Sequence, residues 1–304
     1  MTERLQFEGL RGDLRYDEPL ARRTSWRCGG RADRFYIPAD REDFAAFVTQ
    51  LPAAEPVTML GLGSNMLVRD GGVRGTVILM HTALTVLRIR DALIYAEAGV
   101  ATPKVARFAA NHDRGDAEFL AGIPGTVGGA LWMNAGCYGG ETWRYVARVE
   151  ILTRKGDFER RLPSEYIIGY RSVRRAATQA PEGMFTAAWF SFPPGDGLRA
   201  RQRITHLLQR RIATQPLGLP NAGSVFRNPE ADHAARLIEN CGLKGCAIGG
   251  VRVSEKHANF IVNPGGRGSA ADIEALIGHV RETVRAKTGV LLQTEVQVIG
   301  EVAA

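Results

Sequence analysis

The sequence predicts an α+β protein of several domains, in which short strands alternate with helices without building one long doubly wound sheet. At 304 residues the chain has room for two or three domains. Its apolar runs are short, and several alternate with polar residues as half-buried strands do. Turn residues separate these runs, and the strongest linker signal is FPPGDG at residues 192–197. We therefore expect domains at residues 1–80, 81–200 and 201–304.

The first eighty residues predict a βαββ unit. A polar segment of about 20 residues comes first, and we expect it to be a packed or fraying leader. A short strand at 34–37 precedes a helix with Asp40 as its N-cap, whose apolar side runs from Phe44 to Leu51. Further strands are expected at residues 57–60, 66–68 and 77–80.

The remaining chain predicts more short elements of both kinds. Two strands flank a hairpin position at Arg90-Asp91, and a helix capped by Thr102 follows. The final helix begins with the capping box of Ser269 and Asp272 and ends at Gly289. We expect other strands at 146–152, 158–162, 184–190, 251–253, 260–262 and 291–299, and other helices at 198–211 and 231–240.

Composition restricts the partners. The net charge of +7, from 39 Lys and Arg against 32 Asp and Glu, favours anionic ligands. The arginines are spread along the chain without interleaved aromatics, which argues against nucleic acid. The four cysteines form no CxxC pair and no His stands at zinc spacing, so we expect free thiols and no metal. Without a signal peptide or a run of about eighteen apolar residues, we expect a cytoplasmic protein that does not insert into membranes.

Two glycine-rich stretches are the strongest functional signals. Residues 61–65 read GLGSN between two apolar runs, and residues 120–136, LAGIPGTVGGALWMNAG, contain five glycines. Glycine lets main-chain N–H groups come close to a ligand, and such donors suit an anion such as a pyrophosphate. Alone, each stretch is equally well explained as a tight turn between core elements. Together, roughly sixty residues apart, the two could close on one extended phosphate ligand.

Other motifs are absent or ambiguous. No GxGxxG opens a βαβ unit and no GxxxxGK[ST] occurs, so a Rossmann site and a P-loop are not supported. Without HExxH or an Asp/Glu/His cluster, a metal hydrolase is disfavoured. Tyr170-Arg171, Ser224 and Glu295 could carry chemistry. Taken alone, they also fit a surface arginine, a turn serine and the exposed face of a strand.

Several segments occur together in a specific order: TSWRCGGRAD (24–33), GLGSNML (61–67), GIPGTVGGALWMNAG (122–136), GYR (169–171), GSVFRNP (223–229), SEKHANFIVN (254–263), and residues 292–300 around Glu295. In this combination the chain resembles the UDP-N-acetylenolpyruvoylglucosamine reductases of bacterial cell-wall synthesis. The resemblance runs from about residue 24 to residue 300. It is to the shorter subtype, which lacks an inserted substrate-closing loop.

The resemblance implies an FAD-binding fold of the vanillyl-alcohol oxidase (PCMH) type, made of two subdomains, followed by an α+β substrate-binding C-terminal domain. It implies a flavoprotein oxidoreductase of peptidoglycan synthesis, and hence of cell wall biogenesis, cell shape and cell division. NADPH would reduce the FAD and leave. UDP-N-acetylglucosamine enolpyruvate would then enter the same pocket and be converted to UDP-N-acetylmuramate. We expect a monomer with these small molecules, and no nucleic acid, as partners.

The resemblance also assigns residues. Flavin N5 would pass hydride to the vinyl carbon, Ser224 would supply the proton, and Arg171 and Glu295 would stabilise the enolate. A serine hydroxyl is a weak acid, so this role requires fixed geometry. The substrate would contact Tyr170, Gln215, Gly223 and Asn228. The cofactor would be held by Gly61, Leu62, Gly63, Ser64, Asn65, Met66, Gly122, Ile123, Gly125, Thr126, Gly128, Gly129 and Ala130, with Asn134 nearby.

The chain departs from the family pattern at a few positions. In this chain Ser172 comes directly after Arg171 and is followed by Val173 and Arg174, whereas the family usually has its serine two residues after the arginine. Gln293-Thr294 stands where the family often has Glu-Pro. Cys137 replaces a more usual alanine. Three alternatives stay open: an FAD-linked oxidase of the same fold acting on another small substrate, a basic module that binds nucleic acid, and a cell-wall assembly partner without turnover. Flavin binding, and reoxidation of the flavin by the sugar nucleotide, would distinguish them.

Overall fold

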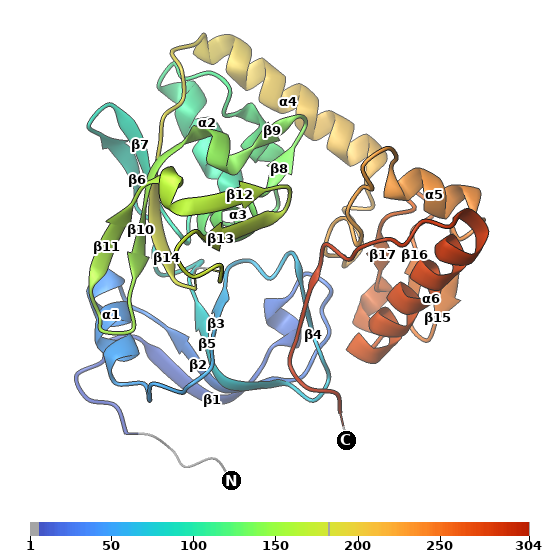
Figure 1. The fold of residues 1–304 in the computed structure, drawn as a ribbon, viewed down its shortest axis with the longest axis horizontal. Helices are drawn as coiled ribbons and strands as arrows, with labels where there is room; N and C mark the ends of the chain where they lie inside the picture. Colours follow the sequence, from blue (N-terminus) through green and yellow to red (C-terminus); the bar gives the residue numbers. More distant parts are fainter. Residues whose placement is uncertain (1–5, 182, 304) are drawn as a thin grey trace. The chain divides into compact units, whose positions relative to one another are not determined.

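The computed structural model describes residues 6–181 and 183–303, which fold into two compact units (Figure 1). The chain passes from one unit to the other inside strands β1 (Asp13–Pro19), β2 (Arg31–Ile37) and β5 (Val73–Leu79), and inside helix α4 (Gly197–Thr214). It also crosses between Gly61 and Leu62. The domain boundaries expected near residues 80 and 200 stay a prediction. Unit 1 consists of Met1–Tyr16, Arg34–Gly61 and Gly75–Arg210, and unit 2 of Asp17–Asp33, Leu62–Arg74 and Arg211–Ala304.

A four-stranded sheet in the order β1-β2-β5-β3 contains three of the strands predicted in the first eighty residues, and β3 (Val57–Leu60) runs parallel to β5. The strand predicted at 66–68 forms as β4 (Met66–Val68) but lies outside this sheet, where it pairs with β18 (Gln297–Ile299). Helix α1 (Arg41–Thr49) begins as predicted, because the Asp40 side chain accepts a hydrogen bond from the Asp43 amide. Of the two alternatives expected for the polar leader, packed or fraying, its described part is packed, because Phe7, Leu10 and Leu14 lie against buried apolar residues. Residues 13–19 form β1 at the edge of this sheet, a strand that was not predicted.

Unit 1 also contains a five-stranded antiparallel sheet in the order β11-β10-β14-β7-β6. Apolar side chains of helices α2 (Thr102–Asn111) and α3 (Val127–Met133) share one core with this sheet. Figure 1 shows where the two helices lie in the fold. Thr102 is not the predicted cap. Its hydroxyl donates to the Ile123 carbonyl at 2.7 Å, and Ala101 takes the N-cap position. The sheet strands are β6 (Leu87–Arg90), β7 (Leu93–Glu97), β10 (Val146–Leu152), β11 (Phe158–Arg161) and β14 (Phe185–Phe190).

Arginines cover aromatic side chains that lie outside that main core. Trp189 is fully buried and packs edge-on against Tyr95. The guanidinium carbons of Arg148 and Arg160 lie 4.7 and 5.4 Å from its ring, and Arg88 lies 5.3 Å from the Tyr95 ring. Cations at these distances attract the face of an aromatic ring. Part of the positive charge therefore stabilises the fold.

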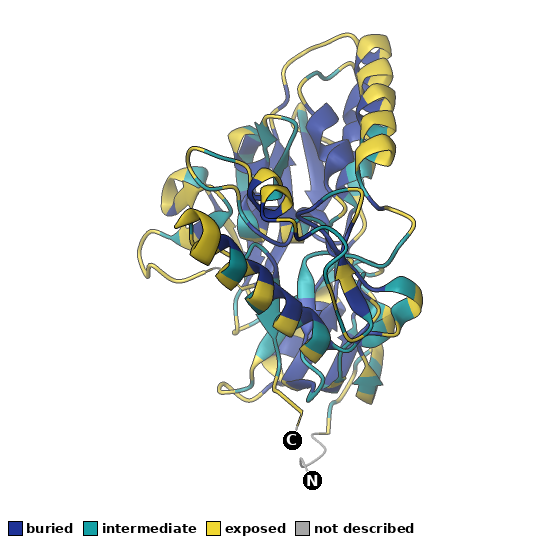
Figure 2. Ribbon diagram, turned by 90° about the vertical axis from the view of Figure 1, so that its right-hand side faces the viewer, coloured by how far each residue is buried: buried dark blue, intermediate teal, exposed yellow. Residues whose placement is uncertain are grey.

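Unit 2 is built around helix α6 (Ala270–Thr288) and short strands. The Ser269–Asp272 capping box forms as predicted, and Gly289 ends the helix at φ 75°. The buried side of α6 carries Ile273, Leu276, Ile277, Val280 and Val284, and Figure 2 shows helices that are buried on one side and exposed on the other. The other elements are α5 (Ala234–Asn240), β15 (Ala247–Ile248), β16 (Val251–Val253), β17 (Ile261–Val262), and β4 (Met66–Val68) paired in parallel with β18 (Gln297–Ile299).

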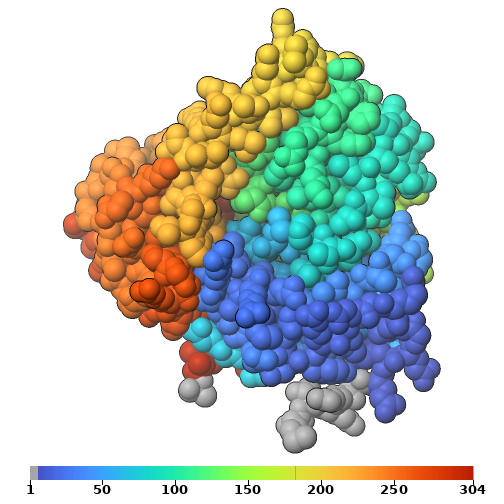
Figure 3. Space-filling model, turned by 180° about the vertical axis from the view of Figure 1, so that it is seen from behind, coloured from blue at the N-terminus to red at the C-terminus, as the bar shows by residue number. Residues whose placement is uncertain are grey.

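The last strand is shorter than predicted, because residues ahead of β18 pair elsewhere: Thr294 forms a bridge with Phe226. Helix α4 is mostly exposed, as expected for an amphipathic helix, and Figure 3 shows it in gold at the surface. No helix in the described part of the chain is long and apolar enough to cross a membrane. Two hairpins complete unit 1: β8 (Gly136–Cys137) with β9 (Gly140–Glu141), and β12 (Tyr166–Gly169) with β13 (Ser172–Arg175).

Candidate active site

The first glycine-rich stretch forms the predicted turn between β3 and β4. A Cβ on Gly61 would lie 2.5 Å from the hydroxyl of Thr126, so Gly61 packs directly against the second stretch. Gly63 has φ 60°, and a Cβ there would lie 2.1 Å from the Arg23 carbonyl oxygen. The Gly63 carbonyl accepts a hydrogen bond from the Ser25 amide at 3.1 Å. Packing within the chain therefore requires glycine at both positions.

The second stretch is only partly a loop, because residues 127–133 form helix α3. Thr126 is its N-cap, and the hydroxyl accepts from the Gly129 amide at 3.4 Å. The Gly128 amide donates to the Ala98 carbonyl at 2.8 Å, which fixes the helix on the sheet. Gly129 differs: it is exposed, and a Cβ there would meet nothing nearer than 3.8 Å. Packing within the chain does not require glycine at this position.

Several amides of the two stretches are available to a ligand. Within the described residues, the amides of Leu62, Gly63 and Ser64 have no acceptor in the chain, and neither do those of Gly125 and Thr126. Backbone N–H groups rarely stay without a partner unless water or a ligand supplies one. Both stretches therefore retain donors suited to an anion.

Tyr170 and Arg171 form the turn of the β12–β13 hairpin, in which Gly169 pairs with Ser172. The backbone of Arg171 has φ 53°, uncommon for a residue with a side chain. Its Nη2 donates to the Gly136 carbonyl at 2.9 Å, and its guanidinium carbon lies 4.9 Å from the Tyr170 ring. This hairpin was not predicted, because no alternation of apolar and polar residues marks its strands and both Ile167 and Ile168 are exposed.

Asn134 lies at the C-terminal end of α3, with φ 46° and 1% of its surface exposed. Its Nδ2 donates to the Glu141 carboxylate at 3.0 Å and to the Gly169 carbonyl at 3.2 Å. Its Oδ1 accepts from the Trp143 amide at 3.1 Å. The side chain is thus engaged inside unit 1, and its expected contact with the cofactor stays a prediction.

In unit 2, Ser224 and Glu295 lie on paired segments. The Glu295 amide donates to the Val225 carbonyl at 2.8 Å, next to the Phe226–Thr294 bridge. Both site residues are half-buried. Gly223, with φ 75°, precedes Ser224, as the sharp change of direction there requires.

The GLGSN turn adjoins the same segment. Asn65 Nδ2 donates to the Glu295 carbonyl at 3.2 Å, and the Gln297 amide donates to the Asn65 carbonyl at 3.0 Å. Unit 2 therefore brings together Asn65, Ser224 and Glu295, which are far apart in the sequence. Arg171 belongs to unit 1, and its association with these residues stays a prediction.

Of the residues expected at the substrate, Gln215 accepts a hydrogen bond from Arg211 Nε at 3.0 Å, just after α4. Asn228 Oδ1 accepts from the Ala234 amide at 3.1 Å, at the start of α5. Asn228 also lines a cavity of about 560 Å³ in unit 2, with Pro229, Glu230, Ala231, Asp232, His233 and Arg236.

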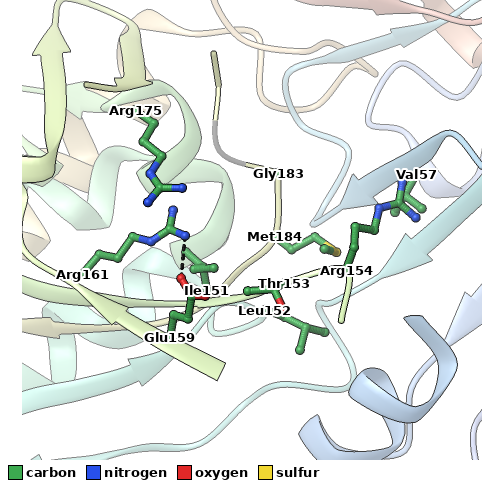
Figure 4. A pocket seen from close by; sticks show the side chains of 10 residues that line it. All are labelled: Val57, Ile151, Leu152, Thr153, Arg154, Glu159, Arg161, Arg175, Gly183 and Met184. Carbon is green, nitrogen blue, oxygen red and sulfur yellow. Dashed lines mark hydrogen bonds and ion pairs between the residues drawn. The ribbon is translucent and has the colours of Figure 1, made fainter. Parts of the chain in front are cut away.

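A second cavity, of about 490 Å³, lies in unit 1 and is bordered by three arginines (Figure 4). Arg161 forms an ion pair with Glu159 at 2.7 Å, and Arg154 donates to the Glu55 carbonyl at 2.6 Å. None of the residues predicted for the site lines this cavity. Its lining residues are Val57, Ile151, Leu152, Thr153, Arg154, Glu159, Arg161, Arg175, Gly183 and Met184.

Comparison with known proteins identifies the two halves of the chain. Residues 32–160 match the family described as FAD binding domain, and residues 215–299 match the UDP-N-acetylenolpyruvoylglucosamine reductase C-terminal domain. The chain is 56% identical over 317 residues to the UDP-N-acetylenolpyruvoylglucosamine reductase of Nitrosospira multiformis, covering 97% of this chain and 91% of that protein. The corresponding protein of Thiobacillus denitrificans is 56% identical over 307 residues, with coverage of 96% and 94%.

The chain belongs to the UDP-N-acetylenolpyruvoylglucosamine reductase family. The crystal structure of the family member from Thermus caldophilus matches with a TM-score of 0.78 at 29% identity, covering 96% of this chain and all of that one. The family and the fold class predicted from the sequence, an FAD-binding fold followed by the family's C-terminal domain, are therefore confirmed. So is the prediction of an FAD-dependent oxidoreductase.

Proposed function

We propose that this protein reduces UDP-N-acetylglucosamine enolpyruvate to UDP-N-acetylmuramate in peptidoglycan precursor synthesis, with FAD as its bound cofactor and NADPH as the reductant. Membership of the reductase family over nearly the whole chain carries this proposal. The FAD binding domain matches residues 32–160, and the reductase C-terminal domain matches residues 215–299.

The two glycine-rich stretches fit the pyrophosphate of FAD. The amides of Leu62, Gly63 and Ser64 in one stretch, and of Gly125 and Thr126 in the other, have no acceptor within the described chain and suit an anion. We assign the remaining contacts to Gly61, Asn65, Met66, Gly122, Ile123, Gly128, Gly129 and Ala130. The glycines among them have no Cβ, which lets a ligand come close to the backbone. FAD, when bound, supplies the hydride that the reaction needs.

Arg171, Ser224 and Glu295 serve the reduction in different ways. The guanidinium of Arg171 carries a permanent charge in a planar fork, which suits the carboxylate of the enolpyruvyl group. Glu295 is the second side chain that we assign to stabilising the enolate. Ser224 gives its hydroxyl proton to the carbon next to the carboxylate. The backbone bond between Glu295 and Val225 supports this role, because it fixes the segment that carries the serine.

The two half-reactions test these roles. The purified protein should be yellow, and NADPH should bleach its flavin band with or without the sugar nucleotide. Ser224→Ala should keep this reduction and slow reoxidation by UDP-N-acetylglucosamine enolpyruvate by about 10²–10⁴-fold, the usual contribution of a general acid. Equal losses in both half-reactions would give Ser224 a structural role. A colourless protein that takes up no FAD would refute the cofactor assignment.

The remaining expectations extend this proposal. Tyr170, Gln215, Gly223 and Asn228 contact the substrate, and the protein acts as a monomer in the cytoplasm without binding nucleic acid. The domain edges near residues 80 and 200 separate two FAD-binding subdomains and the substrate domain. Size-exclusion chromatography with light scattering tests the monomer, and a dimer would overturn that part.

A further inference from the structure

We infer that Asn134 is a positioning residue for Arg171, which it holds in place through the β12–β13 hairpin. This inference rests on the proposed function, because the role of Arg171 in the reduction is part of that proposal. It depends on contacts within unit 1 only.

Asn134 holds the hairpin at two points. Its side-chain Nδ2 donates to the carbonyl of Gly169, two residues before Arg171, at 3.2 Å. Its backbone carbonyl accepts from Arg171 Nη1 at 3.4 Å, and the nearby Gly136 carbonyl accepts from Nη2 at 2.9 Å. One residue therefore fixes both the turn that carries the arginine and the direction of its guanidinium.

The hairpin depends on such outside support. A two-stranded hairpin is only marginally stable on its own. Tyr166 and Val173 are buried, whereas Ile167 and Ile168 are 48% and 37% exposed, so apolar packing secures only part of it. The φ of 53° at Arg171 disfavours the turn further. Bonds from the end of α3 therefore contribute substantially to keeping the arginine in one position.

Asparagine fits this position better than any other residue type. The left-handed backbone, φ 46°, admits Gly, Asn and Asp most easily. Glycine would lose all the side-chain bonds. Aspartate would place a second carboxylate beside Glu141 and offer an acceptor to the Gly169 carbonyl, where a donor is needed. With 1% of Asn134 exposed, water has little access to replace the lost bonds.

The test combines single and double variants with the two half-reactions. Asn134→Gly keeps the backbone conformation and removes the amide. We expect FAD content and the rate of flavin reduction by NADPH to stay within about twofold of the wild type. Reoxidation by UDP-N-acetylglucosamine enolpyruvate should slow by at least about tenfold, which corresponds to one lost hydrogen-bonded contact of about 1.4 kcal/mol. The double variant Asn134→Gly with Arg171→Lys should reoxidise little more slowly than Arg171→Lys alone.

Thr142→Val is the matched control. The Thr142 hydroxyl is buried in the same segment and donates to the Ala135 carbonyl at 2.7 Å. Among the described residues it makes no hydrogen bond to the hairpin or to Arg171. This variant should lower stability by a similar amount and leave the rate of reoxidation unchanged. If it slowed reoxidation as much as Asn134→Gly, the effect would be general loosening of the segment, and the inference would be overturned.

Other outcomes separate the inference from the proposed function. If Arg171→Lys reoxidised at the wild-type rate, the role proposed for Arg171 would be wrong. If Arg171→Lys were slow and Asn134→Gly were not, the inference alone would fail. Loss of FAD, or slower reduction by NADPH, in Asn134→Gly would instead place Asn134 at the cofactor. Should Asn134→Gly not fold, Asn134→Asp should show the same selective loss, and an equal loss in both half-reactions would overturn the inference.

Discussion

Asn259 holds the segment that carries Ser224, and its removal should be costly. The side chain is 4% exposed, with Oδ1 accepting from the Phe226 amide at 2.9 Å and Nδ2 donating to the Phe226 carbonyl at 2.8 Å. Asn259→Ala would leave both backbone groups of Phe226 buried without partners. Each such group costs about 1–3 kcal/mol, so the variant should lose roughly 4 kcal/mol of unfolding free energy. Typical domains are stable by only about 5–15 kcal/mol, so this loss is large.

Urea unfolding measures this loss as a lower midpoint at an unchanged slope. Asn221→Ala is the matched control, because the Asn221 side chain also bonds only to backbone groups. It makes three such hydrogen bonds, to Pro216, Leu219 and Gly223, against two for Asn259. Asn221 is only half-buried, so water can replace the lost bonds and the expected cost is about 1 kcal/mol or less. Equal costs for the two variants would refute the argument that burial of the Phe226 backbone sets the magnitude.

Two further predictions concern the cofactor turns and pH. Gly129→Ala should raise the unfolding free energy by up to about 1 kcal/mol through helix propensity, and it should weaken FAD retention in ultrafiltration. Gly63→Ala should instead lower the unfolding free energy of the chain. Unchanged FAD retention in Gly129→Ala would mean that the cofactor does not approach this residue. Burial lowers the pKa of His257 from its ordinary 6.5, so the stability given by its neutral ring is complete above about pH 6.5 and is lost as pH falls through the lower folded-state pKa. Thermal melts between pH 7.5 and 5 should show this loss of stability as a falling melting temperature, and the fall should be smaller in His257→Gln. A fall of equal size in that variant would exclude His257 as the cause.

Local chemistry made much of the fold predictable. The caps at Asp40 and Ser269 were predicted correctly because each depends on a side chain that binds an amide three residues away. Strand β3 was predicted at its observed bounds, 57–60, from its apolar run. Thr102 was misassigned because its hydroxyl binds Ile123, a distant partner that no local pattern indicates.

The arrangement of the candidate site was less accessible to local patterns. The resemblance to the reductases identified Ser224 and Glu295, but their placement on paired segments depends on backbone hydrogen bonds between distant residues. The hairpin that carries Arg171 escaped prediction because its isoleucines are exposed. The hydrogen bonds of Asn134 could likewise not be predicted from the sequence, because they join the end of α3 to the backbone of Trp143 and to the β12–β13 hairpin.

The pairing of β4 with β18 has a consequence for how the protein matures. Met66 at the start of β4 pairs with Gln297, near the other end of the chain, and Asn65 bonds to residues of that same late segment. On the ribosome, the GLGSN turn is made early but gains these partners only after residues 297–299 have been synthesised. Closing so long a loop is entropically costly and slows folding. The FAD contact proposed for this turn should therefore form only after residues 297–299 have been synthesised and paired with β4.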